Sequence, residues 1–222
     1  MKLIHPDWTT NIEFSEGGIE LIQIESPAYF SIVLQELFDQ KQTGNGRFIL
    51  SDDNGITNFS KSVELILSPF ALDFGNRKIV SEIFKRLMNI AQEEEIIETH
   101  EITGEILKYI YRLIDYERID ITLNDEIDLQ QLLKAAGVRV AIDETDVLTR
   151  LTDYIFLIKE ILNIKLVICA NLQSYFSKEQ MLLLKQTAEV GKISLLLLQS
   201  GANFEIIDRK HALIIDADLC EI

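Results

Sequence analysis

Two apolar segments in the second half of the sequence constrain the fold more than any other feature. "KLVICAN" at 165–171 and "ISLLLLQS" at 193–200 are apolar at nearly every position, and the helical segment "SKEQMLLLKQTAEVG" separates them. Strands that are apolar on both faces are typical of parallel sheets covered by helices on both sides. We therefore expect an α/β fold with a parallel or mixed sheet.

The N-terminal part of the chain predicts further strands and one helix. "NIEF" and "GIELIQIE" flank the turn sequence "SEGG" and predict a hairpin. Ser26 and Pro27 are a typical N-cap and first helical residue. "GRFILSDD" predicts another strand, preceded by a hairpin turn at "TGNGRF", and "FEIIDRKHALIIDAD" predicts a terminal hairpin. The sheet is thus expected to draw on both ends of the chain.

Between 76 and 138 the apolar residues adopt a helical period. Two series recur at three- or four-residue spacing: Ile79, Ile83, Leu87 and Ile90, then Ile102, Ile106, Ile110 and Leu113. A third helix, "EIDLQQLLKAA", is expected to begin at Asn124 or Asp125 and to stop at Gly137. We therefore predict an α/β head domain (1–75 and 139–222) with an inserted α-helical leg domain (76–138).

Composition limits the classes of function. The 222 residues carry 36 acids against 21 bases, a formal net charge of −15, which argues against indiscriminate binding to nucleic acid or anionic membrane. Two cysteines do not form a disulfide framework, and the N-terminus lacks the apolar stretch of a signal peptide. We expect a soluble, cytoplasmic protein.

Motifs for catalysis are missing from the sequence. It contains neither the G-x-x-x-x-G-K-[ST] loop nor the G-x-G-x-x-G turn of nucleotide-binding proteins. His5, His100 and His211 lack the partners of a zinc site and are interpreted as surface or capping residues. Cys169 lies in an apolar strand and is interpreted as a small buried hydrophobe. We expect no enzymatic activity.

Carboxylates are concentrated in "YERIDITLNDEIDLQQLLKAAGV" at 116–138. The candidate metal ligands in it are Glu117, Asp120, Asp125, Glu126 and Asp128. One interpretation places Asp125 and Glu126 in the first turn of a helix, where the helix dipole favours negative charge. The other is a Ca²⁺ site, because this ion prefers several carboxylates together with carbonyl and water oxygens. The spacing is not that of an EF-hand, and both interpretations stay open.

Cations follow a weaker pattern in the same region. The candidates are Arg77, Lys78, Lys85 and Arg86 on one predicted helix, with Lys134 and Arg139 beyond the acidic stretch. Any one of them is explained by a solvated helix face. A nucleic-acid surface requires several chains to pool their cations around one opening, and no helix-turn-helix, zinc finger or RNP-type pattern offers base readout.

The order of these segments resembles a known family. "HPDW", "GGIELIQIESPAYFSIVLQELFDQ", "GRFILSDD", "KSVELILSPFALDF", the acidic reversal and "LLKAAGVRV" are similar to the ring-forming accessory protein of type II-A CRISPR adaptation modules. The resemblance implies a homotetrameric ring whose subunits have a head resembling a degenerate P-loop ATPase core and an inserted helical leg. It further implies that linear double-stranded DNA enters the ring from a free end, without sequence preference, to assist spacer acquisition in antiviral defence.

The resemblance also suggests residue roles and partners. It makes Glu117, Asp120, Asp125, Glu126 and Asp128 the Ca²⁺ candidates, although Thr122 and Asn124 interrupt acids that relatives extend. It implies that lysines and arginines line the central hole that DNA enters. Lys134 is the first candidate, then Arg139, with Arg77, Lys78, Lys85 and Arg86 after them. The CRISPR integrase and effector nuclease are the implied protein partners. Two alternatives remain: a degenerate ATPase-like scaffold that acts only through protein contacts, and a metal-dependent nuclease using the same carboxylates.

Overall fold

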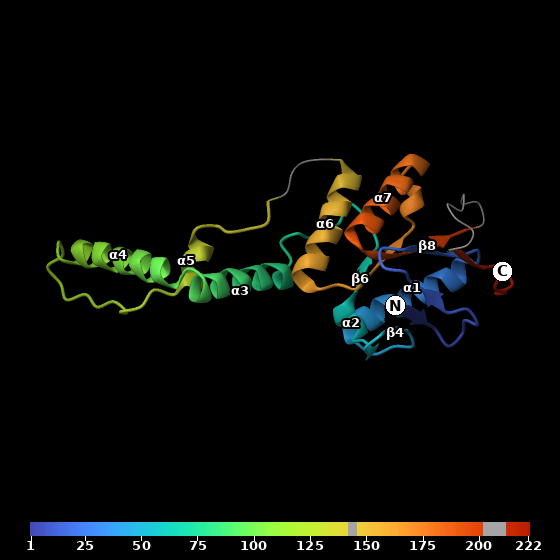
Figure 1. The fold of residues 1–222 in the computed structure, drawn as a ribbon, viewed down its shortest axis with the longest axis horizontal. Coiled ribbons are helices and arrows are strands. Elements are labelled where there is room, and N and C mark those ends of the chain that lie inside the picture. Colours follow the sequence, from blue (N-terminus) through green and yellow to red (C-terminus); the bar gives the residue numbers. More distant parts are fainter. Residues whose placement is uncertain (142–145, 202–211) are drawn as a thin grey trace. The chain divides into compact units, whose positions relative to one another are not determined.

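The computed structural model describes residues 1–141, 146–201 and 212–222. The chain divides into two compact units, which we call the sheet unit (Met1–Asp73 with Ile142–Ile222) and the helical unit (Phe74–Ala141). Figure 1 shows the elements of both units. Within the described ranges, no helix combines the length and apolar character needed to span a bilayer.

The sheet unit contains two β-sheets. The larger has the strand order β6-β7-β8-β3-β9, and all its neighbouring pairs are parallel. The smaller is antiparallel, with the order β2-β1-β4-β5. The strands are Lys2–Ile4 (β1), Ile12–Glu13 (β2), Ile19–Ile24 (β3), Ile49–Asp52 (β4), Gly55–Ile56 (β5), Val63–Ile66 (β6), Leu166–Ala170 (β7), Ser194–Ser200 (β8) and Ala212–Ile215 (β9). The predicted α/β fold with a parallel sheet is confirmed.

Helices cover both faces of the parallel sheet (Figure 1). The helices of this unit are α1 (Pro27–Thr43), α2 (Phe59–Ser62), α6 (Val147–Leu162) and α7 (Lys178–Gly191), with a 3₁₀ helix η1 (Leu172–Ser174). Leu37 of α1 shares one buried core with Leu196 and Leu198 of β8, whereas Leu195 faces α6 and α7. Because alternate side chains of β8 enter two helix layers, the strand is apolar on both faces.

Helix ends in the sheet unit follow the local sequence signals. Ser26 caps α1, with Pro27 as its first residue, and Ser177 and Gln180 form a capping box at the start of α7. The predicted C-cap Gly191 is instead the last residue of α7, and Lys192 takes the left-handed conformation (φ 52°). The packing explains this glycine, because a Cβ at position 191 would lie 2.4 Å from Cε1 of Phe156.

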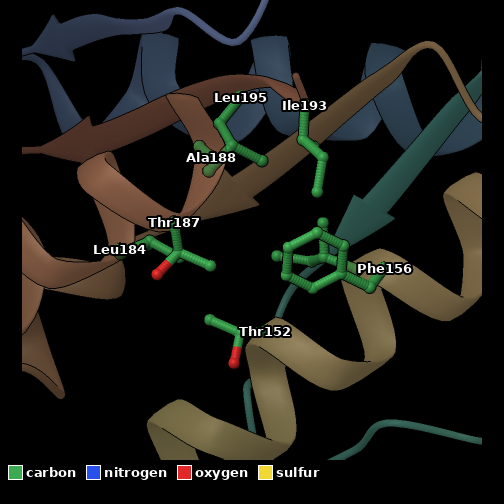
Figure 2. A pocket seen from close by; sticks show the side chains of 8 residues that line it. Thr152, Phe156, Leu184, Thr187, Ala188, Ile193 and Leu195 are labelled. Carbon is green, nitrogen blue, oxygen red and sulfur yellow. The ribbon is translucent and has the colours of Figure 1, made fainter. Parts of the chain in front are cut away.

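Figure 2 shows the junction of α6, α7 and β8. Phe156, Leu184, Ala188 and Leu195 are among the side chains that surround an apolar cavity of about 10 Å³. A space of this size holds at most about one water molecule and offers it no polar partners. The junction is therefore close-packed core.

Two turns predicted from local sequence are wrong. β2 pairs with β1, whereas β3 pairs with β8 and β9, so "NIEF" and "GIELIQIE" belong to different sheets. Gly44 of "TGNGRF" ends α1 with φ 78° and donates its N–H to Gln40 O, so it forms no hairpin turn. The second half of the predicted terminal hairpin contains β9, which runs parallel to β3. The first half, residues 204–211 with His211, lies outside the described residues.

His5 is buried, in contrast to the predicted surface position. Its Nε2–H donates to Glu36 Oε2 at 2.9 Å, and its Nδ1 accepts the backbone N–H of Asp7 at 3.4 Å. Arg47 donates to both Glu36 and Asp7, which extends the network to the surface. Cys169, in contrast, is buried as predicted, and burial raises the pKa of its thiol to about 12.

The His5–Glu36–Arg47 network predicts a pH-dependent stability. Burial raises the pKa of Glu36, but hydrogen bonds from Arg47 and His5 outweigh it and hold this pKa below the ordinary value of 4.5. The contribution of the ionised carboxylate is therefore complete above about pH 4.5 and is lost as the pH falls through the lowered pKa. The free energy of unfolding of the wild type, measured in urea, is expected to approach that of Glu36→Gln on acidification. If the free energies of unfolding of the wild type and Glu36→Gln differ by the same amount at acidic and at neutral pH, the role of the network is refuted.

The helical unit contains α3 (Arg77–Glu93), α4 (Ile96–Ile114) and α5 (Leu129–Ala135), and α3 contacts the other two. The first two confirm the helices predicted from apolar spacing. Ile79 and Phe84 of α3 are buried, whereas α4 and α5 contain no buried residue. Within one chain, the helical unit therefore leaves much of its apolar surface uncovered.

Candidate metal and nucleic-acid sites on the helical unit

The acidic segment lies between α4 and α5, and all five predicted metal ligands in it are exposed. Glu117 and Asp120 follow α4. Asp128 caps α5 by accepting the N–H of Gln131 at 3.1 Å. The predicted start of this helix at Asn124 or Asp125 is therefore wrong, and Asp125 and Glu126 precede its first turn. The helix dipole consequently explains Asp128 alone.

Asp125 has a different partner. Tyr111 near the end of α4 donates its hydroxyl to Asp125 Oδ1 at 3.1 Å. This hydrogen bond, together with the charge of the carboxylate, raises the pKa of Tyr111. The contact ties the segment before α5 to the end of α4.

The carboxylates of the acidic segment are not gathered around one point in the part of the chain that the structure describes. In the described residues, no three His, Cys, Asp or Glu side chains are placed to hold one metal ion. Ca²⁺ takes six to eight oxygen ligands. A site on this segment would have to gain main-chain carbonyls, water or carboxylates of another chain.

The candidate cations divide into two groups. Arg77 and Lys78 are exposed in the first turn of α3, and Lys134 and Arg139 are exposed at the end of α5 and beyond it. A positive charge at a helix N-terminus opposes the helix dipole, a cost of about 0.3–1 kcal/mol. Folding therefore does not explain the cations that open α3.

Lys85 and Arg86 are less available than these four. Lys85 follows Lys78 by seven residues and therefore lies on the same face of α3. It pairs with Glu82 at 3.5 Å on the surface. Arg86 is half-buried and engaged in an interaction. The structure thus separates well-exposed candidates at both ends of the helical unit from two that already have neighbours.

An apolar stripe on α4 was not recognised as a functional feature from the sequence. Ile102, Tyr109 and Leu113, at spacings of seven and four, share one helix face and are 59%, 54% and 48% exposed. Spacing alone predicts an apolar face but does not distinguish a face buried in one chain from a face covered by another. The exposure of these three side chains, which only the structure shows, distinguishes the stripe from a face buried within the chain.

A pocket in the helical unit was also missed. It lies between the second half of α3, the first half of α4 and residues 125–129, and has a volume of about 640 Å³. We call it the α3–α4 pocket. Its walls come from three segments distant in sequence, so no local pattern could indicate it.

The sheet unit has no room for a phosphate loop after β3. This strand ends at Ile24 and α1 begins at Pro27, so only Glu25 and Ser26 connect them. A phosphate-binding loop needs several residues and glycines whose N–H groups surround the phosphate. The connection agrees with the missing nucleotide motif.

Comparisons with known proteins identify the family. The chain is similar to the structure of cbiO1 from Clostridium perfringens, part of the ABC transporter complex cbiONQ, at 12% identity and a TM-score of 0.44, covering 93% of this chain and 76% of that one. The ATP-binding cassette MJ0796, bound to ADP and Pi, has 14% identity and a TM-score of 0.38, covering 93% and 83%. No curated protein matches. The family model of the CRISPR-associated protein (Cas_Csn2) matches residues 40–219, so the chain belongs to this CRISPR-associated family.

Proposed function

We propose that this protein is a non-catalytic, sequence-independent binder of linear double-stranded DNA that assists CRISPR spacer acquisition. In this proposal, four copies form a ring, each with an α/β head (1–75 and 139–222) and a helical leg (76–138), and cations of the leg face the central hole. Family membership supports the CRISPR-associated role. The observation that carries the DNA contact is the set of exposed cations, Arg77, Lys78, Lys134 and Arg139, in a strongly acidic chain.

Electrostatics favour a hole over an open surface. With a net charge of −15 per chain, four copies repel DNA at long range. At physiological salt, charges interact over only about 8–10 Å. DNA inside a ring would bring phosphates within this distance of Lys134 and Arg139 from every subunit. Binding through phosphates has no dependence on base sequence.

The exposed stripe of α4 supports the proposed assembly. A helix of 19 residues without a single buried residue is poorly supported in one chain. Tertiary packing of an apolar face, rather than helix propensity, supplies most of the stability of helices in proteins. Contact between the stripes of neighbouring subunits would provide this packing, at Ile102, Tyr109 and Leu113.

Calcium belongs to the proposal as a ligand of the assembled ring. Glu117, Asp120, Asp125, Glu126 and Asp128 are the candidate ligands, with oxygens from a neighbouring chain completing the shell. Ca²⁺ at these carboxylates would neutralise charge that otherwise opposes both subunit contact and DNA binding.

The proposal predicts a difference between linear and circular DNA. With Ca²⁺ present, a linear duplex is expected to shift in a native gel, whereas a closed circle of the same sequence is not, because only a free end can enter a ring. Equal binding of both forms would exclude threading. Unchanged binding in excess chelator would exclude the calcium requirement.

A second candidate function is an ATPase-like scaffold that acts only through protein–protein contacts. The exposed stripe of α4 favours it as much as it favours a ring. It predicts that no metal ion confers affinity for DNA and that a specific CRISPR protein, such as the integrase or the effector nuclease, is retained in a pull-down. The gel experiment therefore separates the two candidates.

A further inference from the structure

Two buried glutamines lie at the carboxyl end of the parallel sheet. Gln23 and Gln199 are the next-to-last residues of β3 and β8, and they are direct partners in the register of these two strands. Side chains of register partners lie on the same face of a sheet. Leu195, four residues before Gln199, faces α6 and α7, so both glutamines lie on this face. Open α/β sheets bind their ligands beyond the carboxyl ends of the strands, where these two residues lie.

The amide of Gln199 has no partner in the described chain. The residue is 0% exposed, yet neither its Nε2 nor its Oε1 forms a hydrogen bond with any described residue. Gln23, 3% exposed, donates Nε2 to Gly201 O at 2.8 Å, but its Oε1 accepts no hydrogen bond from the described part of the chain. Most buried polar side chains in proteins are hydrogen-bonded, because an unpaired one costs stability. These three atoms therefore indicate a partner that the described chain does not supply.

Gln40 shows how a buried glutamine is satisfied elsewhere in the sheet unit. It is 4% exposed, donates Nε2 to Phe48 O at 2.7 Å and accepts the N–H of Phe48 with Oε1 at 2.9 Å. Both halves of this amide are thus paired within the chain. At Gln199 they are not, although the four preceding positions of β8 are all leucine. Packing alone therefore does not explain why an amide follows them.

The short helix η1 begins directly beside Gln199. Asn171, the residue before η1, donates its N–H to Leu198 O at 2.8 Å and accepts the N–H of Ser200 at 2.9 Å, so η1 is held against the end of β8. Nε2 of Gln173 in η1 is buried and has no acceptor among the described residues. The same end of the sheet therefore contains an unpaired donor from η1 in addition to the unpaired atoms of β3 and β8.

Exposed aromatic rings follow at the end of η1. Tyr175 is the next residue and is 45% exposed, and its ring packs edge-on against Phe70, which is 59% exposed, with centroids 5.4 Å apart. Nucleobases stack on aromatic rings, and a glutamine amide pairs with a donor and an acceptor that lie side by side on a base, as in adenine. The two-residue connection after β3 leaves no phosphate loop. The chemistry of this end of the sheet therefore fits an uncharged base rather than a phosphate.

We infer that the carboxyl ends of β3 and β8, together with η1, bind an uncharged nucleobase. Gln199 pairs with a donor and an acceptor on one edge of the base, Gln23 Oε1 accepts a further N–H, and Gln173 Nε2 donates to a further acceptor. Tyr175 and Phe70 offer the aromatic surface for stacking. Duplex DNA inside the proposed ring keeps its bases paired, so this site is independent of the proposed DNA binding.

Gln199→Leu tests the unpaired amide without any ligand. The substitution removes both unpartnered atoms and keeps a side chain of similar size, so the melting temperature of the full-length protein is expected to rise by about 2–4 °C. Gln40→Leu is the control and is expected to lower the melting temperature, because Phe48 loses both hydrogen bonds. Differential scanning calorimetry measures both. A lower melting temperature for Gln199→Leu would show that its amide is already paired within the protein, and would overturn the assignment of a site.

Titration with free nucleosides tests the ligand. Adenosine, guanosine, cytidine and uridine are the probes, ribose is the control for the sugar, and isothermal titration calorimetry measures binding to the full-length protein. At least one nucleoside is expected to bind the wild type while ribose does not. Gln199→Leu is expected to weaken that binding about tenfold or more, because it removes a paired donor and acceptor.

A second variant separates this site from the proposed DNA contacts. Lys134→Ala with Arg139→Ala is expected to bind the nucleoside as the wild type does, even where it loses duplex DNA. Equal nucleoside binding by the wild type and Gln199→Leu would place the ligand elsewhere and overturn the inference. A higher melting temperature of Gln199→Leu without binding of any nucleoside would assign the unpaired atoms to buried water, and would overturn it as well.

Discussion

Replacing Lys134 and Arg139 together by alanine is expected to reduce the affinity for linear duplex DNA by about a hundredfold or more. Both side chains are exposed, and a ring of four would lose both at every subunit. The slope of log K against log salt concentration is negative, and each phosphate contact that is lost reduces its magnitude by about 0.9. Anisotropy titrations of a labelled duplex at several salt concentrations measure both quantities.

The matched control removes the same charge from the sheet unit. Lys61 and Lys192 are exposed there, and their double replacement by alanine makes each chain more negative by the same amount. This variant is expected to change the affinity only slightly and to keep the wild-type salt slope. If both double variants lose affinity to the same degree, net charge rather than the helical unit governs binding, and the assignment of the hole is wrong.

Leu184→Ala is expected to destabilise the sheet unit by about 2–5 kcal/mol, the usual cost of removing a buried leucine side chain. Leu184 is 1% exposed and lines the junction of α6, α7 and β8 (Figure 2). Its truncation enlarges a cavity that already exists there, and the cost of such a substitution rises with the volume left empty. Urea unfolding followed by circular dichroism measures the change.

The neighbouring residue provides the control. Leu183 is also a leucine of α7 but is 53% exposed. Leu183→Ala is expected to change the free energy of unfolding by about 0.5 kcal/mol or less, as for most surface substitutions. Similar losses for the two variants would show that the packing of α7 on the sheet differs from the structure. A large loss for Leu183 alone would place it in an interface between chains.

The sequence predicted the elements of the fold better than their pairing. The apolar runs of β7 and β8 and the capping box at Ser177 identified strands and a helix because burial on both faces and cap chemistry are local properties. The pairing of β3 is not local. Its partners are β8 and β9 near the opposite end of the chain, so the turn signal at "SEGG" suggested a hairpin with the nearest strand. His5 was misplaced for the same reason, because its partner Glu36 belongs to another element.

The sequence indicated which residues could form the candidate sites but not how these residues are arranged in space. The sequence located the acids around Asp125 and the cations around Lys134, and the structure shows them exposed. It gave no indication that Tyr111 binds Asp125, or that Gly104 opens into a pocket. Those features depend on how α3, α4 and the segment before α5 pack together. The exposed stripe of α4 has the apolar spacing of a buried face, which sequence alone does not separate from an interface.

The position of β3 between β8 and β9 has a consequence for synthesis in the cell. Ile19 pairs with Leu195, and Leu21 pairs with Ala212. During translation, β3 is therefore synthesised long before both of its partner strands. Until then the nascent chain holds an apolar strand with both edges open, a state prone to aggregation. The helices between 77 and 135 contact one another and can form before the last strands of the sheet are synthesised. Translation speed and chaperone supply should therefore govern the soluble yield of this protein.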